Sequence, residues 1–205
     1  MRGPVTIAVT GPFASGKSTL VRLLGELPKT ETASADEIVH HLLKNDQQTI
    51  SRIAERFGEG VRGTDGIDRK ALGREVFGDA EALRDLEEVL HPLVRDETDR
   101  RIESSDAELF VVEIPLLFEA GRGEDFDYTV AVTVPEERRR TWSGNRGVDD
   151  AALEAIESRQ FTGEDKARRA DLVVRNDGDL DRLREQAEAI GREVLHEGGS
   201  REHLR

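Results

Sequence analysis

Gly11-Pro12-Phe13-Ala14-Ser15-Gly16-Lys17-Ser18 has the spacing of a phosphate-binding loop, G-x-x-x-x-G-K-[ST]. Such a loop folds tightly enough for successive backbone N–H groups to point at phosphate oxygens. Lys17 then reaches the β and γ phosphates, and the Ser18 hydroxyl is a ligand for Mg²⁺. The helix that follows adds the positive end of its dipole. The motif therefore predicts that the chain binds a nucleotide.

The segments on either side of the loop favour the same interpretation. The preceding run Val5–Thr10 is short, apolar and rich in β-branched residues, as in a strand buried on both faces of a parallel sheet. The apolar pattern after the loop has helical spacing and ends at Pro28; it consists of Leu20, Leu23, Leu24 and Leu27. A glycine turn without a ligand is the alternative, but a turn alone needs neither Lys17 nor Ser18.

Further along the chain, β-type apolar runs at 109–114, 128–134 and 172–174 alternate with helical patterns. This alternation predicts an α/β fold with a parallel sheet covered by helices. We expect another short strand at 31–34 and a last helix over 179–196, with Leu180 on its buried stripe. Residues 36–104 read as a mostly helical insertion, in which His91-Pro92 predicts a break between two helices.

Composition limits the class of protein. The 205 residues fit one domain, with no cysteine and no apolar run of membrane-spanning length. The first strand begins at Val5, which leaves no room for a signal peptide, so we expect a cytoplasmic enzyme. The formal net charge of −13 argues against nucleic acid as a partner. Residues 138–169 nevertheless concentrate arginine, either around an anion or on a solvated helix face.

Three acids are candidates for the chemistry of phosphoryl transfer, which needs a carboxylate beside the acceptor hydroxyl. Asp36 opens a helix after the expected strand 31–34, where it either orients an acceptor or caps the helix. Glu113 ends the run 109–114 and either holds Mg²⁺, directly or through water, or is an ordinary strand-end acid. Glu119 has a structural role or contacts substrate. His91 contacts substrate or sits at a helix junction, and the other histidines lack metal-ligand spacing.

The chain resembles the dephospho-CoA kinases over nearly its whole length. The order of His91-Pro92 and Pro115-Leu116-Leu117-Phe118-Glu119 is more specific than the phosphate loop, which many kinases share. The segments that carry the likeness are 11–19, 34–38, 65–73, 76–77, 90–94, 115–119, 146–147, Gln160 and 170–178.

The resemblance implies a P-loop kinase with three parts. These are a core (1–35, 105–140 and 167–196), a helical acceptor-binding part (36–104) and a lid (141–166), followed by a tail (197–205). The implied reaction is transfer of phosphate from ATP, with Mg²⁺, to the ribose 3′-hydroxyl of 3′-dephospho-CoA, the last step of coenzyme A biosynthesis. No nucleic acid or membrane partner is expected, and monomer and homo-oligomer stay open.

The resemblance also implies residue roles. Asp36, Lys17, Arg146 and Arg140 are the predicted catalytic residues. The predicted nucleotide-binding residues are Gly11, Ala14, Ser15, Gly16, Lys17, Ser18, Thr19 and Asn176. His91, Pro115, Leu116 and Glu119 are predicted to bind the acceptor, and Ser18 with Glu113 through water to bind the metal.

The chain departs from the family pattern at three places. The loop opens Gly-Pro-Phe-Ala where the family has Gly-Gly-Ile-Gly, and Pro12 lacks a backbone N–H. Ser34 replaces the first Asp of Asp-Ala-Asp. Trp142 stands where the family has its first lid arginine, so that either Arg139 or Arg140 has to replace that arginine.

Two rival functions remain at this stage. One is another small-molecule kinase on the same scaffold, acting on a nucleoside monophosphate, a sugar acid or shikimate. The other is a nucleotide-dependent switch protein without an acceptor. The preference between ATP and GTP is open as well.

Overall fold

The computed structural model describes residues 3–76 and 78–197, which form two compact units. Unit 1 contains Met1–Ser34 and Ile102–Arg205, and unit 2 contains Ala35–Arg101. Phe77 and positions 198–205 of the predicted tail lie outside the described residues. Within the described ranges, no helix is long and apolar enough to cross a membrane.

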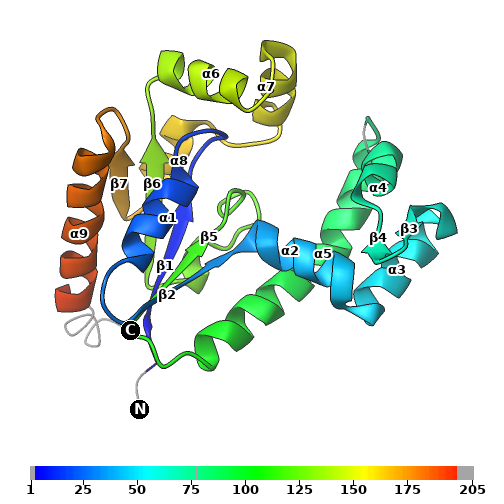
Figure 1. The fold of residues 1–205 in the computed structure, drawn as a ribbon, viewed down its shortest axis with the longest axis horizontal. Coiled ribbons are helices and arrows are strands. Elements are labelled where there is room, and N and C mark those ends of the chain that lie inside the picture. The colour runs from blue at the N-terminus through cyan, green and yellow to red at the C-terminus, as the bar shows by residue number, and fades with distance from the viewer. Residues whose placement is uncertain (1–2, 77, 198–205) are drawn as a thin grey trace. The chain divides into compact units, whose positions relative to one another are not determined.

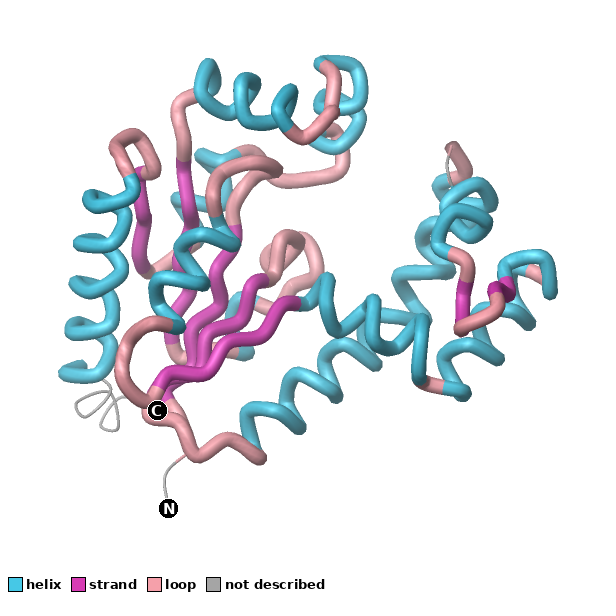
Figure 2. The backbone as a smooth tube through the Cα atoms, viewed as in Figure 1, coloured by secondary structure: helices cyan, strands magenta, loops and turns pink. Residues whose placement is uncertain are grey.

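Unit 1 is built on a five-stranded parallel sheet with the order β2-β5-β1-β6-β7 (Figures 1 and 2). Its strands are β1 (Val5–Thr10), β2 (Thr30–Ser34), β5 (Leu109–Glu113), β6 (Tyr128–Thr133) and β7 (Leu172–Arg175). The predicted α/β class and the short second strand are confirmed. Since β1 lies in the middle, the loop that follows it leaves the centre of the sheet's carboxyl edge, where ligands of open α/β sheets bind.

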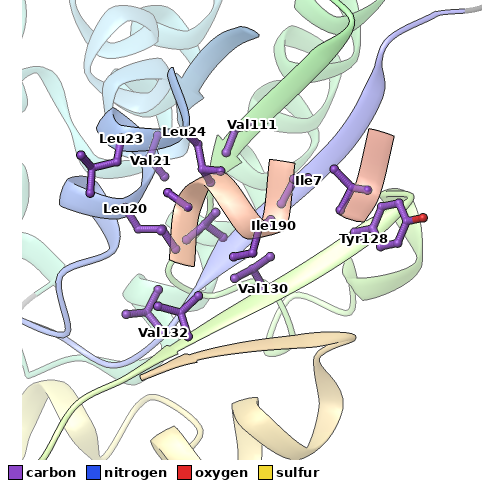
Figure 3. Close-up of a cluster of buried hydrophobic side chains, with 14 of the residues drawn as sticks. Ile7, Leu20, Val21, Leu23, Leu24, Val111, Tyr128, Val130, Val132 and Ile190 are labelled. Carbon is purple, nitrogen blue, oxygen red and sulfur yellow. The ribbon is translucent and has the colours of Figure 1, made fainter. Parts of the chain in front are cut away.

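One face of this sheet is covered by α1 (Lys17–Gly25) and α9 (Leu180–Glu197). The alternate residues Ile7, Val111, Val130 and Val132 point from the strands toward Leu20 and Leu24 of α1 and Ile190 of α9 (Figure 3). Each of these side chains is at most 7% exposed. The hydrophobic effect on this face therefore fixes α1, and with it the end of the phosphate loop.

The other face carries α8 (Gly163–Arg169), which packs against β6. Thr133 and Val173 alternate with the core residues Val132 and Val174, and they line a cavity of about 500 Å³ together with Ala167 of α8. The remaining elements of unit 1 are η2 (Gly123–Asp125), α6 (Glu136–Asn145) and α7 (Asp150–Glu157).

Unit 2 is mainly helical, as the sequence predicted. Its elements are α2 (Ala35–Asn45), α3 (Gln47–Phe57), η1 (Glu59–Val61), the short hairpin β3 (Arg62–Gly63) and β4 (Gly66–Ile67), α4 (Arg69–Val76) and α5 (Ala80–Glu103), whose last residues belong to unit 1. A separate apolar cluster holds it together, including Leu43, Ile53, Val61 and Leu72.

Two sequence predictions about helices are wrong. Pro92 lies inside α5, which runs unbroken through the expected junction. Proline removes a single backbone hydrogen bond there, and Leu90 and Val94, both buried, lie on either side of it. Leu180, expected in the buried stripe of the last helix, is 48% exposed because it starts α9 beyond the core.

Candidate active site

The phosphate loop connects β1 to α1 and is held in a tight conformation. Gly16 has φ 95°, and Ala14 has φ 57° although it carries a side chain. The Nζ of Lys17 donates to the Pro12 carbonyl at 3.0 Å, so the lysine side chain folds back over the loop. The Ser15 amide donates to the same carbonyl at 3.3 Å. Left-handed residues alternating with right-handed ones turn backbone N–H groups to one side, as in anion-binding nests.

Asn176, just beyond the end of β7, braces this loop from outside. Its Nδ2 donates to the Ser15 carbonyl at 2.9 Å, and the residue is only 7% exposed. A Cβ on Gly16 would overlap that same nitrogen, so glycine is required here both by φ and by space. Asn176 was predicted to bind the nucleotide; its amide nitrogen supports the loop instead, and its contact with a nucleotide remains a prediction.

The Ser18 hydroxyl and the Glu113 carboxylate meet at the carboxyl edge of the sheet. Ser18 Oγ donates to Glu113 Oε1 at 3.1 Å. The strand register places Glu113 beside Val9 of β1 and Ser34 of β2. A hydroxyl next to a carboxylate is the oxygen donor set that Mg²⁺ prefers, so these two side chains fit the metal predicted for them.

A pocket of about 360 Å³ lies between the phosphate loop, α6 and the start of α9. The residues that line it include Gly16, Thr19, Trp142, Arg146, Asn176 and Leu180. An aromatic ring and an aliphatic side chain in the lining suit a flat heterocycle, and Gly16 and Thr19 bring the phosphate loop and α1 to the same pocket. The exposure of Leu180 is explained by its place in this lining.

Arg138, Trp142 and Arg146 lie along one side of α6 and its C-cap. These residues are four apart, so they share a helix face. The Arg138 guanidinium carbon lies 5.7 Å from the centre of the Trp142 ring, and Nη1 donates to the Gly178 carbonyl at 2.5 Å. Arg138 therefore ties α6 to the loop before α9. Sequence reasoning missed this role, although the i, i+4 spacing to Trp142 was a signal for it.

The neighbouring arginines point elsewhere. Arg139 pairs with Glu157 of α7 and is 13% exposed. Arg140, predicted as catalytic, pairs with Glu136 at 2.9 Å and Asp150 at 3.3 Å, and these carboxylates raise its pKa. Of the predicted lid arginines, the structure thus brings Arg146 to the pocket and does not bring Arg140 there.

Glu119 is engaged within unit 1. Its Oε1 accepts from the Phe161 amide at 2.7 Å and lies 2.9 Å from Nζ of Lys166. Lys166 has no exposed side chain, and it also donates to the Pro115 carbonyl at 2.5 Å. Burial lowers the pKa of Lys166, and the hydrogen bond to Glu119 opposes that effect. The structural role left open for Glu119 is therefore present: it joins the turn after β5 to the base of α8.

Asp36 and the other residues predicted to contact the acceptor are exposed or half-buried. Asp36 is exposed in the first turn of α2, two residues beyond the end of β2. His91 is exposed in the middle of α5, and Leu116 is half-buried in the turn after β5. Among the described residues no cluster of three histidine, cysteine or acidic side chains could hold a metal ion.

Comparisons with known proteins identify related sequences and structures. A family model described as dephospho-CoA kinase matches residues 5–182. A dephospho-CoA kinase of Symbiobacterium thermophilum is 40% identical over 199 residues, covering 94% of this chain and 83% of that protein. A crystal structure from Thermus thermophilus has 33% identity and a TM-score of 0.81, covering 94% of this chain and 99% of its own.

Two other solved structures are similar at lower identity. The dephospho-CoA kinase from Campylobacter jejuni is 26% identical with a TM-score of 0.61, over 92% of this chain and 96% of its own. The shikimate kinase from Acinetobacter baumannii is 17% identical with a TM-score of 0.56, over 94% of each chain. The second likeness concerns the fold alone, so the choice between these two acceptor classes rests on sequence rather than on architecture.

Proposed function

This chain belongs to the dephospho-CoA kinase family, and we propose that it transfers the γ-phosphoryl group of ATP to the ribose 3′-hydroxyl of 3′-dephospho-CoA through the site described above. The products are ADP and coenzyme A. The observation that carries the proposal is the contiguity of the phosphate loop, the Ser18–Glu113 pair and the aromatic-lined pocket within unit 1. The expected cytoplasmic location is part of the same proposal.

The nucleotide is held by the loop and the pocket. Backbone N–H groups of residues 14–19 and the Lys17 ammonium bind the β and γ phosphates. Lys17 exchanges its hydrogen bond to the Pro12 carbonyl for one to phosphate. The base lies in the pocket that Trp142 and Leu180 line, and it stacks on the Trp142 ring. Aromatic stacking on a base contributes on the order of 1–3 kcal/mol.

Ser18 and Glu113 are the residues that would hold Mg²⁺, Glu113 directly or through water. When bound, the ion neutralises negative charge on the phosphates. The pairing of the two side chains fixes the Ser18 hydroxyl toward the carboxyl edge of the sheet. Because that hydroxyl is on the first turn of α1, the loop and the metal ligand are positioned by one helix.

The acceptor hydroxyl is oriented by Asp36, whose carboxylate accepts its proton as the new O–P bond forms. Support comes from the position of Asp36 directly after the strand that ends beside Glu113. Unit 2 is proposed to receive the rest of the acceptor, with His91 as a contact. Pro115, Leu116 and Glu119, which follow β5 in unit 1, are proposed as further contacts.

Arg146 stabilises the charge that develops on the transferred group. It lines the pocket beside Gly16 and Thr19, whereas Arg140 is engaged at the outer side of α6. One arginine in this role raises kcat by about 10³-fold or more in related chemistry. Helices α6 and α7 also exclude water from the γ-phosphate, which prevents simple hydrolysis of ATP.

The role of Asp36 is tested by Asp36→Asn, with Glu37→Gln as a matched control on the same helix turn. We expect Asp36→Asn to lower kcat by a factor of 10² or more and to leave the affinity for ATP within about twofold. Glu37→Gln should retain wild-type kcat. A loss of less than threefold in Asp36→Asn would reduce Asp36 to a helix-capping residue.

A further inference from the structure

Two aromatic residues, Phe13 and Trp142, each lie under an arginine of α6 or its C-cap. The Arg146 guanidinium carbon lies 5.8 Å from the centre of the Phe13 ring, and Arg138 lies at a similar distance over Trp142. Phe13 belongs to the phosphate loop and Arg146 to the end of α6. The Phe13–Arg146 contact is thus a direct link between the loop and the lid.

The backbone of Arg146 is already fixed. Arg146 is the C-cap of α6, and the next residue, Gly147, has φ 74°. The Val148 amide donates to the Ser143 carbonyl at 3.1 Å and the Gly147 amide to the Gly144 carbonyl at 2.9 Å, the pattern of a Schellman motif. The start of the side chain is therefore set by the helix end, while the residue as a whole is exposed.

The Phe13 ring restricts where the Arg146 guanidinium lies. A cation over an aromatic face within about 6 Å is attracted by the ring quadrupole. Phe13 is half-buried and follows Pro12, whose carbonyl accepts a hydrogen bond from the Lys17 ammonium. The Lys17 ammonium and the Arg146 guanidinium thus contact two adjacent residues of the phosphate loop, Pro12 and Phe13. A leucine or isoleucine of similar volume would fill the space but would not attract the charge.

From this arrangement we propose that Phe13 is a positioning residue for Arg146, which holds the lid guanidinium at the mouth of the phosphate loop. It acts on the reaction only through Arg146. Arg146 is the one arginine among the described residues that line the pocket, so the orientation of its guanidinium matters for the site. The inference rests on the role proposed for Arg146 in phosphoryl transfer.

A double-mutant cycle tests the inference. Phe13→Leu should lower kcat about threefold to tenfold with the KM for ATP within twofold, whereas Phe13→Tyr, which keeps the ring, should retain at least half of wild-type kcat. In an Arg146→Ala background, Phe13→Leu should change kcat by less than 1.5-fold. Phe126→Leu is the control, because Phe126 lies under Arg122 at 5.7 Å in the same unit, away from the proposed site residues; it should leave kcat unchanged.

Three outcomes would overturn the inference: an equal loss of kcat from Phe13→Leu in both backgrounds, no loss in either, or an increase. The folded state of each variant is checked by its thermal unfolding midpoint. Inactivity of the unmodified chain toward 3′-dephospho-CoA would instead overturn the proposed function. In that case the Phe13–Arg146 contact is tested by NMR. A ring-current shift of the Arg146 side-chain signals that disappears in Phe13→Leu supports the inference. Arg146 signals that are the same in both proteins refute it.

Discussion

At the scale of single residues, the shape of the phosphate loop depends on a side chain that is far from it in sequence. Asn176 follows β7, yet its amide nitrogen binds the Ser15 carbonyl and fills the space beside Gly16. The loop is therefore not a self-contained motif. Its conformation needs the last strand of the sheet to be in place, so phosphate binding depends on completion of unit 1.

Gly16→Ala measures this dependence. The added Cβ would overlap Asn176, and φ 95° is unfavourable for alanine, so we expect ATP affinity to fall at least tenfold. Trp142, the single tryptophan of the chain, reports nucleotide binding by fluorescence because it lines the pocket. Gly73→Ala is the control, since that Cβ meets open space in α4. Wild-type ATP affinity in Gly16→Ala would contradict the bracing role of Asn176.

The placement of several candidate site residues could be predicted from the sequence because their motif or strand is local. Lys17 and Ser18 follow from the motif, and the register of β5 places Glu113 beside the loop as expected. Arg138 and Lys166 could not be predicted in the same way. Arg138 acts through the Gly178 carbonyl and Lys166 through the Pro115 carbonyl, and backbone acceptors leave no trace in the side-chain pattern.

At the scale of elements, α5 is a long helix that contains a proline and nevertheless continues. The predicted break at His91-Pro92 took account of the lost hydrogen bond, but not of the tertiary contacts of Leu90 and Val94.

Ion pairs in the last turns of α5 add to the stability of this helix. Glu97 accepts hydrogen bonds from Arg100 at 2.8 Å and from Arg101 at 2.7 Å.

Glu97→Gln tests this cluster through the pH dependence of unfolding. The hydrogen bond from Arg100 is the largest cause that lowers the pKa of Glu97 to about 2, and burial opposes it. A carboxyl with a lowered pKa in the folded state stabilises the fold above its unfolded pKa, near 4.5, and loses that effect as the pH falls toward 2. We therefore expect the variant to be less stable by about 1–2 kcal/mol at pH 7, a difference limited by solvent screening of the exposed Arg100.

The difference in the free energy of unfolding, measured by urea titration from pH 7 to pH 3, should shrink below about pH 4.5. Glu88→Gln, at an exposed glutamate on the same helix, is the control and should change the free energy of unfolding at pH 7 by no more than about 0.5 kcal/mol. A Glu97→Gln difference that stays constant over this range would show that the carboxylate charge contributes nothing to stability.

At the scale of the whole molecule, the chain consists of two compact units. Unit 1 contains the phosphate loop, the Ser18–Glu113 pair, the pocket lined by Trp142 and α6–α8, so the groups that we propose for nucleotide binding lie in one unit. Unit 2 has its own apolar cluster and carries Asp36 in its first helix turn. The fold class and the helical insertion could be predicted from sequence, because apolar periodicity reports them directly.

The acceptor could not be identified from the architecture, since shikimate kinase shares this fold. It follows from the family membership of the chain and from the sequence segments around His91 and Pro115.

The most direct test of the central claim is a panel of acceptors incubated with Mg-ATP and the purified chain, with products weighed by mass spectrometry. The panel contains 3′-dephospho-CoA, shikimate, a sugar acid and nucleoside monophosphates, and Lys17→Ala is the inactive control. We predict the gain of one phosphoryl group on 3′-dephospho-CoA alone. Transfer to a different member of the panel, or ATP binding without transfer to any of them, would contradict the account.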